Sequence, residues 1–290
     1  MKSWLLAGLA VFCLTVPPRA GFSEPPGVLL PVADSPGLHA SDPTAAKIAS
    51  GLAAHRAFYK LSLDDTHAGD VVAASGTMSY EVMDACDGWA VQQRLDMIVT
   101  NRDSQDVRMV SDYATWESKD GLKMRFRMRQ TTDTATTEVT SGEASVDRPG
   151  GSGEVRYALP KPNVQKLPMG TLFPMWHTAT IIAAAEQGKK VLSLPLFDGT
   201  GDTGAQDTSV VITSWHTKPA PFRIAALAAL PGGYVHVAFF DRTPDASEPD
   251  YEVSMHYWEN GVADDLRMDF GDFVMRGKLD EFKLAAPHHC

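Results

Sequence analysis

Three pairs of long segments with alternating apolar and polar residues most constrain the fold of this chain. Each pair surrounds an Asp-Gly or Asn-Gly turn, and the pairs are 76–86 with 89–100, 112–119 with 122–131, and 250–259 with 262–270. In the fourth of these segments, Met124, Phe126 and Met128 alternate with lysine and arginine, which is typical of an antiparallel strand with one buried face. The turn dipeptides favour positive φ, so we expect type I′ turns between the paired strands.

Consecutive hairpins of this kind predict a meander. We therefore expect an all-β fold built on a long antiparallel sheet of ten or more strands. A twisted sheet of that size curls on itself, so the expected shape is a curled sheet or an open half-barrel.

Two segments depart from the period of two and predict helices. Residues 173–187 carry an apolar stripe, with Pro174 near the start and Gly188 as the stop. An apolar helix in a β protein usually fills the open side or end of the curled sheet, so we expect this one on or inside it. A shorter helix is expected at 42–52, where Pro43 fits the first helical position.

The N-terminal segment predicts export. Lys2 precedes an apolar run from Trp4 to Val16, which has the length of a signal-peptide core and is too short to span a bilayer. The expected organisation is a cleaved signal peptide at 1–23, an extended leader and short helix at 24–54, and one β domain at 55–290. We expect the mature chain to be periplasmic, without a transmembrane segment, because no later run approaches about 18 apolar residues.

Two cysteines, Cys86 and Cys290, remain once the segment that contains Cys13 is removed. An even pair in an oxidising compartment predicts a disulfide, which would tie the C-terminus to an early hairpin. A nucleophilic Cys86 is the alternative, but the neighbouring Asp84 and Asp87 would raise the pKa of its thiol.

Charge and motif spacing argue against several function classes. The formal net charge is −10, and loss of Lys2 and Arg19 with the signal peptide brings the mature chain near −12, so nucleic acid is not an expected partner. The nine histidines show no zinc spacing, and the G-x-G-x-x-G match at 199–204 is followed by a strand rather than a helix. Calcium at Asp198, Asp202 and Asp207 is an alternative, but their spacing does not fit an EF-hand loop. We therefore expect no catalytic residue, no metal and no cofactor.

Several short segments together resemble the EipB family of alphaproteobacteria, long catalogued as a domain of unknown function (DUF1849-like). They are HRAFYKLSL, CDGW, WESKDGL, FPMWHT, LFDG, YWENGV and the terminal cysteine. The resemblance extends from about His55 to Cys290. It implies a periplasmic protein that maintains cell-envelope integrity, an unbroken β-spiral with a helix near its interior, and a Cys86–Cys290 pair. It supplies no catalytic residues.

We therefore expect a non-enzymatic periplasmic protein that supports envelope integrity by binding an envelope lipid, lipoprotein or periplasmic protein. A lipid or lipoprotein carrier with a half-barrel cleft, a scaffold with a filled interior, and an envelope-polymer enzyme using His177 or Asp202 are the alternatives. Residues expected to line a ligand site, with core packing as the alternative role, are Trp89, Trp116, Phe173, Met175, Trp176 and His177.

Overall fold

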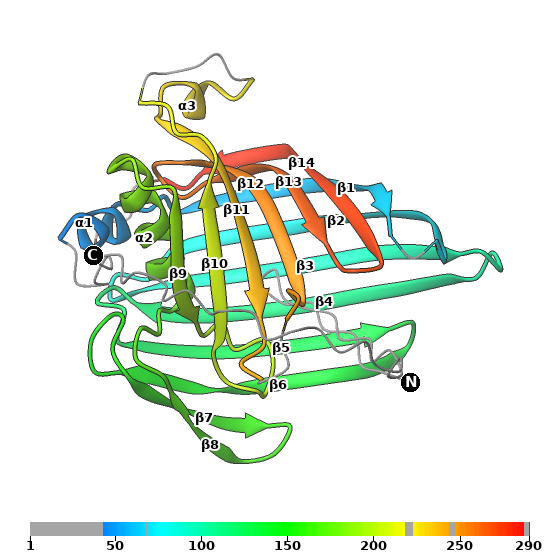
Figure 1. The fold of residues 1–290 in the computed structure, drawn as a ribbon, viewed down its shortest axis with the longest axis horizontal. Helices are drawn as coiled ribbons and strands as arrows, with labels where there is room; N and C mark the ends of the chain where they lie inside the picture. The colour runs from blue at the N-terminus through cyan, green and yellow to red at the C-terminus, as the bar shows by residue number, and fades with distance from the viewer. Residues whose placement is uncertain (1–42, 68, 218–222, 244–246, 287–289) are drawn as a thin grey trace, which may run out of the picture.

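The computed structural model describes residues 43–290 except 68, 218–222, 244–246 and 287–289. The expected signal peptide and leader therefore lie outside the described residues. The described part forms one 14-stranded antiparallel sheet, which confirms the predicted fold class (Figure 1).

The first half of the sheet is formed by long strands and then two shorter ones. They are β1 (His55–Thr66), β2 (Val71–Asp84), β3 (Gly88–Asn101), β4 (Asp106–Ser118), β5 (Lys123–Thr132), β6 (Ala135–Val146), β7 (Gly153–Leu159) and β8 (Asn163–Leu167). The second half consists of β9 (Val191–Leu196), β10 (Gln206–Ile212), β11 (Gly232–Phe240), β12 (Tyr251–Trp258), β13 (Ala263–Asp269) and β14 (Phe273–Leu284).

Strands that follow one another in sequence lie side by side, with one exception. The order is β8-β7-β6-β5-β4-β3-β2-β1-β14-β13-β12-β11-β10-β9, so the first strand pairs with the last and the two edges are β8 and β9. The chain passes between these edges through helix α2 (Pro174–Glu186). Figure 1 shows β9–β12 crossing in front of the long strands β3–β6, with α2 at one end of the space between the two halves.

The predicted hairpins are present, but their turns are not type I′. Positive φ occurs at one residue in each turn, namely Cys86 (67°), Gly121 (70°) and Gly261 (82°). The strands stop a residue or more earlier than expected, which leaves loops of three or four residues. Loops of that length use a single left-handed residue, commonly glycine, rather than two.

Helix α2 is buried on almost every side. Its buried residues run from Met175 to Ala185 with Thr178 as the exception. Gly188, with φ of +74°, ends the helix by donating to the Ala185 carbonyl (3.0 Å), while the amide of Lys189 donates to the Ala184 carbonyl (2.9 Å). This pair of bonds is a Schellman motif, and it agrees with the predicted stop.

The shorter helices lie at the surface. Helix α1 (Pro43–Gly51) packs against α2, and the indole Nε1 of Trp89 donates to the Ala49 carbonyl at its end (3.2 Å). Helix α3 (Ala225–Ala228) is a single turn beside β11. No helix among the described residues has the length and apolar character needed to cross a bilayer.

The gap between edges β8 and β9 is closed by side chains and a loop. Phe173 and Phe197, both fully buried, pack there with Phe126 and Tyr157 in an aromatic cluster with edge-on contacts. The loop at 197–205 crosses the gap, where Gln165 of β8 donates to the Asp202 carbonyl (2.6 Å).

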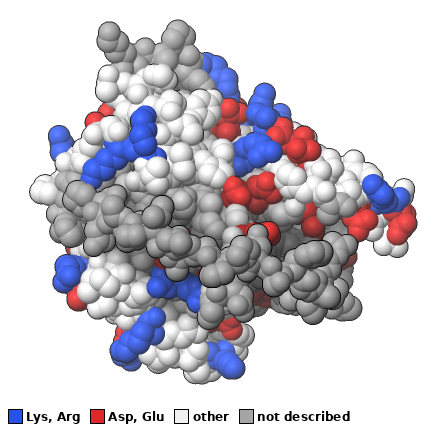
Figure 2. Space-filling model, viewed as in Figure 1, with Lys and Arg blue, Asp and Glu red and all other residues white. Residues whose placement is uncertain are grey.

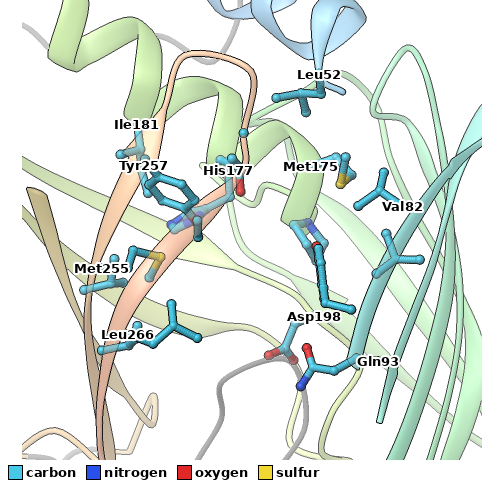
Figure 3. Close-up of a pocket in the computed structure, with 18 of the residues that line it drawn as sticks. Leu52, Val82, Gln93, Met175, His177, Ile181, Asp198, Met255, Tyr257 and Leu266 are labelled. Atoms are coloured by element: carbon cyan, nitrogen blue, oxygen red, sulfur yellow. The ribbon is translucent and has the colours of Figure 1, made fainter. Parts of the chain in front are cut away.

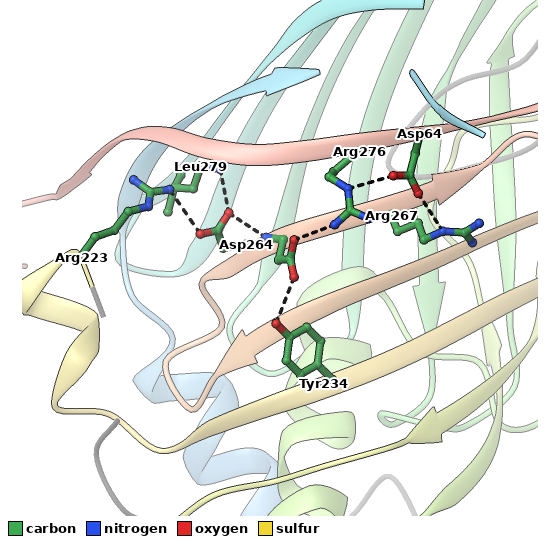
Figure 4. Close-up of polar contacts among 8 residues, drawn as sticks. Asp64, Arg223, Tyr234, Asp264, Arg267, Arg276 and Leu279 are labelled. Atoms are coloured by element: carbon green, nitrogen blue, oxygen red, sulfur yellow. Dashed lines mark hydrogen bonds and ion pairs between the residues drawn. The ribbon is translucent and has the colours of Figure 1, made fainter. Parts of the chain in front are cut away.

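The seam between β1 and β14 is instead a backbone ladder from His55–Leu284 to Thr66–Phe273, interrupted by register shifts after Phe58 and at Asp64. On its outer face, Asp64 accepts from both Arg267 (3.1 Å) and Arg276 (2.9 Å) (Figure 4). Arg276 also reaches Asp265, which accepts from the hydroxyl of Tyr234. In the view of Figure 2, acidic and basic side chains alternate without a wide patch of one sign.

The structure joins Cys86 and Cys290 at disulfide distance, with their sulfur atoms 2.16 Å apart. The bond connects the β2–β3 turn to the residue that ends the chain, which fits the predicted pair. It links a residue beyond β14 to a turn in the first half of the sheet.

Candidate functional site: an interior cavity beside helix α2

The N-terminus of helix α2 is capped by a buried side chain from a distant strand. Phe173 occupies the N-cap position and offers no side-chain acceptor. Glu117 of β4 supplies it, because its two carboxylate oxygens accept from the amides of Met175 (2.8 Å) and Trp176 (3.1 Å). The carboxylate satisfies two of the free amides and faces the positive end of the helix dipole.

Burial raises the pKa of Glu117 to about 8, against the two amide hydrogen bonds that favour its ionised form. The turn between β4 and β5, which follows Glu117, also holds the start of α2 in place. The indole Nε1 of Trp176 donates to the Lys119 carbonyl (3.2 Å), and a Cβ at Gly121 would overlap the indole ring. The glycine is therefore required by close approach as well as by its positive φ.

An interior cavity of about 140 Å³ lies beside α2. Both halves of the sheet line it, together with α2 and the residues that follow α1 (Figure 3). Its apolar lining residues include Leu52, Val82, Val91, Met175, Ile181, Leu196, Val237, Phe239, Val253, Met255 and Leu266. Figure 3 shows Val82 and Met255 on opposite walls, with Asp198 and Gln93 at one end.

Asp198 is the acidic residue of this lining. It follows β9 and is 6% exposed. Its Oδ1 accepts from the amide (3.0 Å) and the hydroxyl (2.8 Å) of Thr200, whereas Oδ2 is buried without a hydrogen-bond partner among the described residues. Burial raises the pKa of Asp198 to about 6, and the bonds from Thr200 oppose the shift.

The backbone around Asp198 is held in place from the first half of the sheet. The hydroxyl of Tyr113 donates to the Asp198 carbonyl, and that of Thr140 donates to the Gly199 carbonyl (3.0 Å). The segment that matched G-x-G-x-x-G is therefore a structural loop across the interior, as expected for an ordinary connection.

His177 lines the cavity from α2. Its Nε2 lies 2.9 Å from the hydroxyl of Thr208, which itself donates to the Leu194 carbonyl (2.6 Å). The Thr208 hydroxyl has one proton, and the bond to Leu194 uses it. His177 therefore carries its own proton on Nε2 and donates it to the Thr208 oxygen. Burial lowers the pKa of His177 to about 4, which keeps the ring neutral.

Of the residues predicted to line a ligand site, Met175 and His177 line the cavity. Phe173 packs against Phe197 in the cluster that closes the β8–β9 gap. Trp176 turns away toward the Lys119 carbonyl. These two residues lie outside the cavity lining and take the alternative role of core packing, because successive side chains of a buried helix face different neighbours.

The other two tryptophans also lie outside the cavity lining. Trp89 is buried beneath α1, with the ammonium of Lys119 3.0 Å from its ring centroid. Trp116 is half-buried on the opposite face of its strand from Thr115 and Glu117, and the guanidinium of Arg125 lies 5.0 Å from its ring centroid. Alternation along β4 therefore places Trp116 on the outer face.

The remaining histidines serve separate contacts. His236 lies between Ser254 (2.9 Å) and Glu252 (2.8 Å) on an open sheet face, and His256 packs on the ring of Trp258. The pair 288–289 lies outside the described residues. Within the described part, His, Cys, Asp and Glu side chains do not gather in a set of three that would hold a metal ion.

Sequence reasoning did not single out Glu117, and it named Asp198 only as a candidate calcium ligand. The two acids are separated in sequence by strands β5–β9 and helix α2, and Glu117 belongs to no spacing motif. Their segments, WESKDGL and LFDG, were nevertheless among those that carried the family resemblance. The structure brings these segments together with FPMWHT around the start of α2.

Comparison with known proteins gives matches to one family over most of the chain. The family model described as EipB-like matches residues 46–286. The cell envelope integrity protein EipB of Brucella abortus (strain 2308) is 31% identical over 236 residues, which is 79% of this chain and 82% of the relative. A crystal structure from Brucella abortus, described as a beta-barrel-like protein of the domain of unknown function DUF1849, is similar with a TM-score of 0.72. It shares 29% identity, and the match covers 81% of this chain and 99% of that chain.

Proposed function

Because the chain belongs to the EipB-like family, we propose that it supports cell-envelope integrity from the periplasm by binding a small group of an envelope component in its interior cavity. The Brucella relative is named for cell envelope integrity, which supports the cellular role. The cavity beside α2 carries the molecular part of the proposal.

The size and lining of the cavity favour a small apolar group. Its volume of about 140 Å³ is close to that of an engineered cavity of about 150 Å³ that binds benzene. Binding sites for small molecules are typically concave and apolar, with a few polar groups that set orientation. The cavity therefore fits a ring or the end of a chain rather than a complete lipid.

We propose a binding role rather than catalysis because the polar groups of the cavity do not form acid–base machinery. His177 donates to Thr208 rather than to a carboxylate, and its lowered pKa leaves it a weak base. Asp198 accepts from Thr200, and Glu117, which lies outside the lining, is occupied by the α2 amides. An activated nucleophile needs a base within reach that is itself oriented by a third group.

A lipid or lipoprotein carrier is the second candidate, and the unpaired edges β8 and β9 favour it. Separation of these edges would widen the interior without breaking a strand ladder. In that case a long acyl chain would bind and would increase hydrogen exchange in β8 and β9.

The proposal is tested by filling the cavity. Val82 lines it from β2, and Val72 lies on the same strand with 53% exposure outside it. We expect Val82→Phe to abolish binding of toluene, measured by NMR titration, and to fail to restore detergent resistance to a strain that lacks the gene. Val72→Phe should behave as wild type in both assays.

Circular dichroism and melting temperature establish that Val82→Phe is folded. A second variant, Val253→Phe, fills the cavity from β12 in the other half of the sheet. Wild-type protein that binds no toluene, or filled variants that restore resistance fully, would contradict the proposal.

A further inference from the structure

The cavity has a distinctive balance of charge. Among the described residues that line it there is one carboxylate, Asp198, and no lysine or arginine. The basic side chains in the lining are His55 and His177, and burial lowers the pKa of each, so both are neutral near pH 7. An ionised Asp198 therefore has no positive partner within the cavity wall.

Half of the Asp198 carboxylate is unsatisfied. Thr200 occupies Oδ1 through two hydrogen bonds, while Oδ2 is buried and unpartnered. Such a group is costly, because a buried acceptor without a donor loses its hydration without compensation. The bonds from Tyr113 to the backbone carbonyl of Asp198 and from Thr140 to that of Gly199 keep the loop from carrying Asp198 into solvent.

Other lining groups also suit a donor or a cation. Gln93 lines the same cavity, and its amide oxygen offers a further acceptor. The lining also contains Tyr59, Tyr80, Tyr113 and Tyr257. Aromatic ring faces attract ammonium groups, and the attraction grows when the site excludes water.

From these observations we infer that the cavity takes a ligand that carries a primary ammonium group on a small apolar body, with the ammonium held by Asp198. This inference rests on the proposed function and names the chemical class of the bound group. An ammonium supplies three donors, and one of them would serve the unpartnered Oδ2. A carboxylate or phosphate at the same position would be repelled.

The experiment uses three ligands of similar size, namely benzylamine, toluene and benzoate, titrated into the full mature chain at neutral pH by calorimetry or NMR. We expect benzylamine to bind about 10- to 100-fold more tightly than toluene, the range that a charged hydrogen bond contributes. Benzoate should bind more weakly than toluene.

Asp198→Asn should remove the preference for benzylamine and retain toluene binding, which reports an intact cavity. Asp202→Asn is the matched control, because Asp202 is an exposed residue of the same loop and does not line the cavity. It should retain the wild-type preference.

Equal binding of benzylamine and toluene to wild type, or an unchanged preference in Asp198→Asn, would overturn the inference and leave the proposed function standing. Absence of binding by all three ligands would overturn both. If Asp198→Asn no longer binds toluene, the variant does not report on the preference. The order of affinities of the three ligands for wild type then decides whether the inference stands.

Discussion

The two places where the ends of this sheet meet are closed by different means. At the β1–β14 seam, the strands pair along β1 from His55 to Thr66, with two register shifts. At the β8–β9 gap, the strands do not pair, and the segment before α2 reaches β9 through a single bridge between Leu172 and Leu196. Helix α2, the aromatic cluster of Phe173 and Phe197, and the 197–205 loop fill the space instead.

The cavity lies between the two halves of the sheet rather than in the gap itself. Its strand lining comes from β1–β4 and β11–β13, and Leu196 is the one lining residue that belongs to β8 or β9. Helix α2 and Asp198, which belong to the stretch of chain that crosses the gap, complete the wall. The paired strands thus supply most of the apolar wall, and the crossing segment supplies the carboxylate.

The largest expected effect comes from breaking the disulfide beyond the seam. The bond links residues 204 apart, and the chain-entropy model assigns about 5 kcal/mol to a loop of that length as an upper value. We expect Cys290→Ser to lower the free energy of unfolding by up to this amount in urea denaturation. Reduced wild type should match the variant, and a melting temperature equal to that of oxidised wild type would contradict the prediction.

Removing a ring from the aromatic cluster tests how much the side chains at the β8–β9 gap contribute to stability. Phe197→Ala removes a fully buried ring, so we expect a loss of about 3–5 kcal/mol in the free energy of unfolding. Phe273→Ala at the seam removes an equally buried ring and should cost a similar amount. Hydrogen exchange separates them, because exchange should increase first in β8 and β9 for Phe197→Ala and in β1 and β14 for Phe273→Ala.

The Glu117 cap on α2 should make the free energy of unfolding depend on pH. Since the pKa of Glu117 is raised to about 8 in the folded state, the native chain binds more protons than the unfolded chain between about pH 4.5 and 8. The contribution of Glu117 to the free energy of unfolding should therefore fall as the pH rises through this window, by at most about 1.4 kcal/mol per pH unit.

Glu117→Gln removes this titration. The difference in unfolding free energy between wild type and Glu117→Gln should decline from pH 5 to pH 8, measured by urea denaturation at each pH. A parallel pair of profiles would show that Glu117 does not titrate in this range.

The smallest effect is expected at the outer face of the seam. Asp64 joins Arg267 and Arg276 in a partly exposed network, and exposed ion pairs contribute about 0.2–1 kcal/mol. We expect Asp64→Asn to destabilise the chain by that amount at low salt and by less at high salt. A loss of several kcal/mol would mean that the seam depends on its ion pairs rather than on its ladder.

Much of the local structure could be predicted from the sequence. The alternation in 122–131 and the glycine of each turn identified hairpins, because strand period and turn conformation are properties of a few neighbouring residues. Helix α2 was located within one residue at each end, since Pro174 and Gly188 act locally. The type of turn was wrong, because loop length depends on where the strand ladder stops.

The candidate site was less predictable. Met175 and His177 were identified from their place on an apolar helix, but the tryptophans were expected to line the cavity and instead pack elsewhere. Asp198 was noted only as a candidate calcium ligand, and Glu117 was not noted at all, because what makes each carboxylate unusual is its burial among residues from other parts of the chain. The amides that Glu117 caps lie 58 and 59 residues further along the chain.

By itself, the sequence determined that this chain forms antiparallel hairpins, one buried helix and a pair of cysteines suited to a disulfide, because these depend on short-range periodicity and on residue chemistry. Only the tertiary structure decided that β14 closes on β1 while β8 and β9 stay apart, and that Asp198 meets an apolar cavity. Those outcomes depend on how a twisted sheet of this length curls and on which side chains then meet across it.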